Sequence, residues 1–185
     1  MLIGVVAETD PRETRVAASP ETVKKFIALG AEVVVQPGAG FAAGVTDADY
    51  RASGARLVEA AKAFGADIVL KVRRPSEPEV VQLKSGALVV ATMDPYGHIP
   101  EIEAMAKAGV SAFAMELMPR ITRAQSMDVL SSQANLAGYR AVVDAAFEYG
   151  RAFPMMMTPA GTVPAGVIII GKARPYSAPA SITAR

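Results

Sequence analysis

Short runs of consecutive apolar residues recur along the chain and constrain its fold more than any other feature. These runs are LIGVVA (2–7), EVVVQ (32–36), DIVLKV (67–72), ALVVAT (87–92), SAFAME (111–116) and VIIIG (167–171). Unbroken apolar runs, as opposed to alternating apolar and polar residues, are typical of strands covered on both faces of a parallel sheet. Other elements must therefore pack on both sides of each predicted strand.

Segments with helical periodicity lie between these apolar runs. Ser19 is placed to cap a helix that Pro20 opens and Gly30 closes. Thr46 is placed to start a second helix, whose apolar pattern continues through Phe64. Further helices are predicted over 77–84 and 99–108. This alternation predicts an α/β fold with a doubly wound, mostly parallel sheet and helices on both faces, in a flavodoxin- or Rossmann-like topology.

The periodicity changes at Gln133, where a long helix is predicted to begin. Leu136, Tyr139 and Val143 form one stripe of this helix, which is expected to end at Gly150 or Pro154. A long helix that leaves one sheet and leads to a new strand indicates a bridge between domains. We therefore predict an N-terminal α/β domain at 1–132, a bridging helix and linker at 133–164, and the start of a truncated or replaced nucleotide-binding domain at 165–185.

The end of the chain lacks the glycine pattern of a dinucleotide-binding loop. The segment VPAGVIIIG predicts a buried strand that ends in glycine, as expected just before such a loop. The residues that follow, KARPYSAPASITAR, contain no further glycine, and Pro175 and Pro179 would interrupt a helix there. The glycine loop that would cradle a dinucleotide phosphate is therefore absent from this segment.

Composition excludes several functional classes. The 19 basic and 18 acidic residues give a net charge of +1, so no nucleic-acid partner is expected. The chain has no cysteine and one histidine, His98, which we interpret as a loop residue without a special task, and no metal site is expected. No apolar run approaches the roughly 18 residues of a membrane span. These features predict a cytoplasmic protein without direct membrane insertion.

Charged residues gather after the first and third apolar runs. The loop after the first run carries Glu8, Arg12, Glu13 and Arg15. This loop is either a ligand site at the end of a strand or a solvated loop with ion pairs. Lys71 lies inside an apolar run and needs a carboxylate or an anionic ligand if it is buried, whereas Arg73 and Arg74 are interpreted as solvated.

The stretch RITRAQSMD, residues 120–128, concentrates polar side chains between two apolar segments. This stretch is part of a longer segment, AMELMPRITRAQSMDVLSSQANLAGYRAVVDAAFEYGRAFPMMMTPAGTVPA. The longer segment resembles the NAD(H)-binding domain of the alpha subunit of proton-translocating NAD(P) transhydrogenases. Two segments nearer the N-terminus are similar to the same family and to its relative, alanine dehydrogenase. They are ETDPRETRVAASPETVKKFIALGAEVVVQPGAG and VLKVRRP. The resemblance extends over about residues 1–171.

This resemblance implies a role for the polar stretch in hydride transfer between NADH and NADP+, coupled to proton translocation. Arg120, Gln125 and Asp128 match the residues of the family loop that closes over the nicotinamide of bound NADH. Ser131 and Tyr139 match further residues near the cofactor. The family also implies NADP(H) on a partner subunit, membrane-embedded partners, a homodimer and a place at the inner face of the membrane. Because the phosphate-binding loop of the family is missing here, the chain alone is expected to be catalytically inactive and to bind NADH very weakly.

Two alternatives remain open. Arg15 and Lys71 match the residues that hold pyruvate in alanine dehydrogenase, which favours a related oxidoreductase. That family carries a catalytic histidine at the position of Asp94, so the proton-transfer group is missing here. The other alternative is a non-catalytic dimerisation module that uses the methionine-rich segments 115–118 and 154–157.

Overall fold

The computed structural model describes residues 1–119, 121–149, 156–158 and 161–163. It divides into two compact units, Met1–Leu130 and Ser131–Arg185. The first unit holds a parallel sheet and the helices that cover it. The second holds most of a long helix and a short strand pair.

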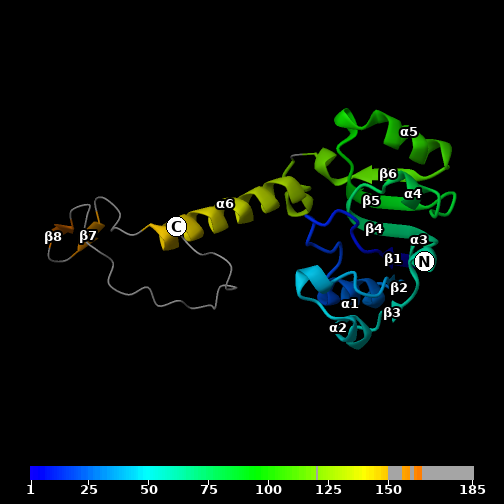
Figure 1. The fold of residues 1–185 in the computed structure, drawn as a ribbon, viewed down its shortest axis with the longest axis horizontal. Coiled ribbons are helices and arrows are strands. Elements are labelled where there is room, and N and C mark those ends of the chain that lie inside the picture. Colours follow the sequence, from blue (N-terminus) through cyan, green and yellow to red (C-terminus); the bar gives the residue numbers. More distant parts are fainter. Residues whose placement is uncertain (120, 150–155, 159–160, 164–185) are drawn as a thin grey trace. The chain divides into compact units, whose positions relative to one another are not determined.

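A six-stranded sheet in the order β3-β2-β1-β4-β5-β6 forms the centre of the first unit (Figure 1). All neighbouring strands run parallel. The strands are β1 (Leu2–Val5), β2 (Glu32–Val35), β3 (Arg56–Leu57), β4 (Ile68–Arg73), β5 (Leu88–Thr92) and β6 (Ser111–Ala114). The chain starts in the middle, winds outward to β3, and returns to place β4 on the other side of β1. This confirms the predicted doubly wound parallel sheet.

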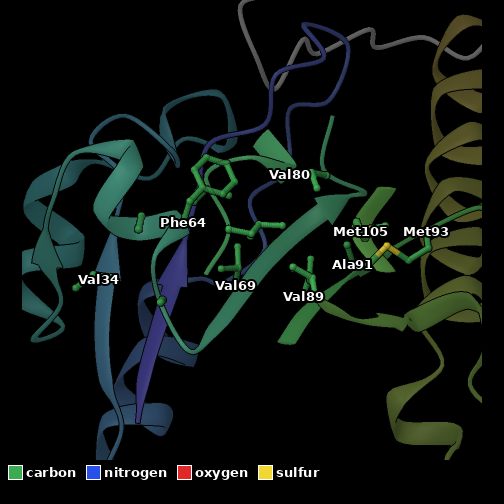
Figure 2. Packing of buried hydrophobic residues seen from close by; sticks show 13 residues of the cluster. Val34, Phe64, Val69, Val80, Val89, Ala91, Met93 and Met105 are labelled. Atoms are coloured by element: carbon green, nitrogen blue, oxygen red, sulfur yellow. The ribbon is translucent and has the colours of Figure 1, made fainter. Parts of the chain in front are cut away.

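Helices cover both faces of this sheet, as the unbroken apolar runs predict. Side chains alternate along each strand, so Val33 and Val35 join one buried cluster while Val34 joins the other. The first cluster also takes residues from α1 (Pro20–Ala28) and α2 (Asp47–Ala52). The second takes residues from α3 (Ala60–Phe64), α4 (Glu77–Val80) and α5 (Ile99–Lys107). Figure 2 shows the second cluster, where Phe64, Val69, Val89 and Met105 come together from α3, β4, β5 and α5.

The predicted helix starts at Ser19 and Thr46 are confirmed. The Ser19 hydroxyl accepts a hydrogen bond from the Thr22 amide at 3.3 Å. Thr46 and Asp49 form a capping box at the start of α2. Each cap satisfies backbone amides that have no partner within the first turn of a helix.

The prediction of one continuous helix from Thr46 to Phe64 was wrong. Gly54 adopts a φ of +94°, a left-handed conformation that follows the end of α2. The chain then forms β3 and pairs with β2, where the Val58 amide donates to the Val35 carbonyl at 3.0 Å. Apolar residues at helical spacing therefore belong to a helix, a two-residue strand and a second helix, because pairing with β2 overrides the local pattern.

The loops that the structure describes contain four short 3₁₀ turns. These are η1 (Phe41–Ala43), η2 (Pro95–Gly97), η3 (Met115–Leu117) and η4 (Gln125–Met127). The predicted helix at 77–84 is shorter than expected, since α4 ends at Val80. The predicted helix at 99–108 corresponds to α5, and Gly109 follows it with a φ of +72°.

The long predicted helix is present as α6 (Val129–Glu148), which has 20 residues. It begins at Val129, earlier than the predicted Gln133, directly after Asp128, the C-cap residue of η4. An antiparallel pair, β7 (Met156–Thr158) and β8 (Gly161–Val163), follows. The strand predicted at 167–171 and the whole predicted segment 165–185 lie outside the described residues. Within the described part of the chain, no helix is long and apolar enough to cross a bilayer.

Candidate functional site

A cavity of about 720 Å³ opens at the carboxyl ends of β1, β4 and β5. The chain reverses its winding direction between β1 and β4, and ligands of doubly wound sheets bind at such a switch point. Residues after β1, β4 and β5 and at the start of α5 line the cavity: Glu8, Thr9, Asp10, Arg12, Arg15, Arg73, Arg74, Pro75, Ser76, Glu77, Thr92, Asp94, His98 and Glu101. The cavity belongs entirely to the first unit.

Arg15 lines this cavity and is engaged by a neighbouring carboxylate. Its Nε and Nη2 lie 2.7 Å from the two carboxylate oxygens of Glu13, a bidentate pair. Arg73 also donates to Glu13, with Nε 3.1 Å from Oε2. Hydrogen bonds from Arg15, together with the nearby Arg73, lower the pKa of the buried Glu13 to about 2. Glu13 is therefore ionised at neutral pH and neutralises part of the positive charge beside the cavity.

The low pKa of Glu13 predicts an acid-dependent loss of stability. Because the folded-state pKa is about 2 against a usual 4.5, the ionised Glu13 stabilises the fold above pH 4.5. We expect this contribution, about 2 kcal/mol after solvent screening of the half-exposed arginines, to disappear as the pH falls towards 2. Urea unfolding of the wild-type chain and Glu13→Gln between pH 6 and about 2 measures it. A stability difference that stays constant over this range would contradict the assignment.

Lys71 is buried in an ion cluster and is not among the residues that line the cavity. Its Nζ lies 2.8 Å from Glu79 Oε1 and 3.7 Å from Glu8 Oε2. Glu79 also accepts from the Ser76 amide and hydroxyl, and Glu8 accepts from the Val72 amide. Burial raises the pKa of Glu8, against the opposing effect of Lys71. The carboxylates that the buried Lys71 requires thus come from the chain itself.

The loop after β5 carries a strained residue. Asp94 has a φ of +46°, the left-handed region that residues other than glycine rarely occupy. Glu116 Oε1 accepts the Met93 amide at 2.8 Å and also the Asp94 amide, which holds this conformation. The Asp94 carboxylate reaches His98, with Oδ2 3.1 Å from Nδ1.

His98, interpreted as a loop residue without a special task, lines the cavity beside Asp94. Arg74 departs from its interpretation as solvated: it is half-buried, lines the cavity, and donates from Nη1 to the Met93 carbonyl at 3.2 Å. Position gives the missed signal for Arg74, since it directly follows the carboxyl end of β4 at the switch point.

The polar stretch forms a tight turn in the first unit. Ala124 is buried and its amide donates to the Ile121 carbonyl at 2.9 Å, which anchors the turn. Gln125 is exposed in η4, and Asp128 is partly buried where η4 ends. Arg120 lies outside the described residues. Ser131 and Tyr139 lie on α6 in the second unit, and both are exposed.

Residues 4–137 match the family described as alanine dehydrogenase/PNT, N-terminal domain. The chain belongs to this family. It is 52% identical over 179 residues to an NAD(P) transhydrogenase alpha subunit of Rhodospirillum rubrum, and the match covers 92% of this chain and 47% of that protein. It is 29% identical to an alanine dehydrogenase of Mycolicibacterium smegmatis over 92% of this chain and 47% of that protein.

Solved structures show the same relationship. The fold is similar to a transhydrogenase from Sinorhizobium meliloti, with a TM-score of 0.80 and 61% identity, over 89% of this chain and 50% of that chain. An L-alanine dehydrogenase gives a TM-score of 0.74 and 27% identity, over 89% of this chain and 46% of that chain. The chain spans about half the length of the curated relatives named above. Transhydrogenase alpha subunits are thus nearer relatives than alanine dehydrogenases.

Proposed function

We propose that this chain is the N-terminal portion of an NAD(P) transhydrogenase alpha subunit and takes part in hydride transfer between NADH and NADP+. The 52% identity to a transhydrogenase alpha subunit supports this, against 29% to an alanine dehydrogenase. The observation that carries the site assignment is the anchored turn that exposes the Gln125 side chain next to Asp128.

The residue types of this turn suit the positioning of a nicotinamide ring. Bound NADH supplies the hydride, and the protein has to hold two rings face to face. The exposed Gln125 amide can donate and accept hydrogen bonds, as recognition of a carboxamide requires. The Asp128 carboxylate accepts hydrogen bonds, which suits ribose hydroxyls. The resemblance to transhydrogenases assigns three further residues to the same cofactor: Arg120, Ser131 and Tyr139.

The proposal includes partners that follow from the same relationship. NAD(H) is the nucleotide of this subunit, and NADP(H) is bound by a partner subunit. Membrane-embedded subunits hold the assembly at the cytoplasmic face of the membrane, and two copies of the alpha subunit form a homodimer. The diphosphate of NADH is bound by a nucleotide-binding domain outside the described residues.

Substitutions in the turn test this function in the complete alpha subunit assembled with its NADP(H)-binding partner. Gln125→Ala and Asp128→Asn are each expected to lower the rate of hydride transfer from NADH to an NADP+ analogue by about tenfold or more. The reason is that a small displacement of the nicotinamide ring from its reactive position strongly slows the transfer. The dissociation constant of NADH is expected to change less than the rate, since most of the binding contacts lie elsewhere.

Arg123→Ala is the matched control for this experiment. Arg123 is exposed in the same turn and has no assigned role, so hydride transfer should stay close to the wild-type rate. Equal rates for all three variants and the wild type would rule out the proposed role of the turn. A similar loss in all three variants would show that the turn acts only through its fold.

An alanine dehydrogenase activity is less consistent with the geometry. Lys71 is held by Glu8 and Glu79 and does not line the cavity, so it is not presented to a keto acid there. Asp94 stands where that family has its catalytic histidine. The absence of pyruvate-dependent NADH oxidation in the complete subunit is the expected result. A dimerisation module without catalysis is the remaining alternative, and the loss of hydride transfer in the turn variants would exclude it.

A further inference from the structure

The polar turn follows shortly after a carboxylate that is bound to the end of β5. Glu116 lies in η3, between β6 and the turn. Its Oε1 accepts the Met93 amide at 2.8 Å and also the Asp94 amide, at the carboxyl end of β5. The Glu116 side chain thus joins the segment that leads into the turn to the neighbouring strand of the sheet.

The backbone that Glu116 binds is itself held firmly. The Met93 side chain is buried and packs with Ala91 and Met105 in the second cluster (Figure 2). The Met93 carbonyl accepts a hydrogen bond from Arg74 Nη1 at 3.2 Å. Hydrogen bonds from amides to a carboxylate are short and strong, so Glu116 is fastened to a well-packed part of the fold.

The backbone hydrogen bonds within the turn are local. The amides of Ala124 and Gln125 both donate to the Ile121 carbonyl, at 2.9 and 3.1 Å. The Met127 amide donates to the Ala124 carbonyl at 2.9 Å. Such bonds fix the shape of the turn but not its position relative to the sheet. That position depends on the burial of Ala124 and on the segments that flank the turn, and Glu116 holds the segment on the N-terminal side.

The second oxygen of Glu116 indicates a role beyond stability. Oε2 is buried and has no hydrogen-bond partner among the described residues. A buried carboxylate oxygen without a partner is costly, because it has lost its water without gaining a donor. A glutamine would keep an acceptor for both amides and would bury no charge. Groups that cost stability in this way are typical of functional sites.

We propose that Glu116 is a positioning residue for hydride transfer, which acts by fixing the polar turn relative to the end of β5. This inference rests on the function proposed above and adds a residue outside the turn that does not itself contact the cofactor. Without the carboxylate, the turn keeps its local hydrogen bonds but can shift, and the alignment of the rings is sensitive to small shifts. The effect therefore falls on the rate of transfer more than on the binding of NADH.

Single-turnover hydride transfer and NADH titration test this in the complete alpha subunit, assembled with its NADP(H)-binding partner. Glu116→Ala is expected to lower the transfer rate by about tenfold or more and to change the dissociation constant of NADH by no more than about threefold. Glu116→Gln keeps an acceptor oxygen for both amides, so its rate should stay within about threefold of the wild type. A wild-type rate in Glu116→Ala would overturn the proposal, as would equally slow transfer in Glu116→Gln and Glu116→Ala.

Asp49→Ala is the matched control. The Asp49 carboxylate also accepts a backbone amide, that of Thr46 at 2.9 Å, but it does so in the capping box of α2 and not beside the turn. Its removal destabilises a helix start and should leave the transfer rate close to the wild-type value. Equal losses of rate in Asp49→Ala and Glu116→Ala would show that transfer merely follows stability, which the proposal does not survive.

A second measurement follows the turn itself, without hydride transfer. In the 185-residue chain, NMR relaxation should give lower order parameters for the Gln125 and Met127 amides in Glu116→Ala than in the wild type. Amides of α1 should not change. Unchanged order parameters in the turn would contradict the role of Glu116. Slow transfer in Gln125→Ala beside a wild-type rate in Glu116→Ala would remove only this inference, whereas wild-type rates in both turn variants would remove the proposed function.

Glu116→Asp keeps the experiment decisive if Glu116→Ala does not fold. Aspartate retains the carboxylate on a shorter side chain, which draws it back from the amides of Met93 and Asp94. The transfer rate is then expected to fall by about threefold or more, because the turn is held less closely. A wild-type rate in a cooperatively folded Glu116→Asp would refute the positioning role.

Discussion

Replacement of Lys71 by methionine is expected to destabilise the first unit by about 3–5 kcal/mol at neutral pH. The Lys71 side chain is 1% exposed, and its ammonium is the countercharge of Glu8 and Glu79, which are nearly as buried. Without it, two carboxylates face each other in a medium of low dielectric constant. A loss of this size is a large part of the total stability of a typical domain, about 5–15 kcal/mol.

Urea unfolding at pH 7 measures this effect, and Lys84→Met is its control. Lys84 forms a similar ion pair with Asp67 at 2.7 Å, but its side chain is 57% exposed, so the cost should stay below about 1 kcal/mol. Adding Glu79→Gln to Lys71→Met should recover part of the lost stability, because one unpaired charge is removed. Equal destabilisation by Lys71→Met and Lys84→Met would refute this account of the cluster.

Gly4→Ala is expected to destabilise the fold by about 3 kcal/mol or more, because the added methyl group would clash with the backbone of α3. A Cβ atom at position 4 would lie 2.1 Å from the Ala63 carbonyl oxygen and 3.0 Å from the Ala66 Cβ. Since the Ala63 oxygen belongs to the backbone of α3, no side-chain rotation can relieve the contact. Either β1 or α3 would have to move, and both belong to the centre of the unit.

Thermal unfolding of Gly4→Ala compared with Gly65→Ala tests this prediction. Gly65 follows α3 with a negative φ, and an added Cβ there would come no closer than 3.4 Å to Ala61. The control should therefore change stability by less than about 0.5–1 kcal/mol. A wild-type melting temperature for Gly4→Ala would mean that β1 and α3 do not approach as closely as described.

The six-stranded sheet could be predicted from the sequence because each of its strands, apart from β3, lies within or largely overlaps one of the apolar runs. Burial on both faces leaves this signature whatever the neighbours are. β3 was missed because Arg56 and Leu57 form too short a strand to show a period, and the residues around them fit a helix. The close approach of β1 and α3 at Gly4 could not be predicted from the sequence either, because it depends on which helix packs across β1.

The candidate site was only partly predictable, for a related reason. The position of the charged loop after β1 follows from the doubly wound topology, and Lys71 was correctly expected to need a partner if buried. Glu79 as its principal partner could not be foreseen, because the pairing depends on how α4 packs against β4. The role proposed for Gln125 and Asp128 comes from the resemblance, since a polar turn before a helix has no distinctive pattern of its own.

The backbone conformation of Asp94 and the contact of its side chain favour different residues at this position. A left-handed backbone conformation costs an aspartate on the order of 1 kcal/mol that a glycine would not incur. Selection for a robust fold alone would therefore favour glycine there, yet glycine would leave His98 without its carboxylate neighbour. Variants selected only for heat resistance would thus tend to lose the contact between Asp94 and His98.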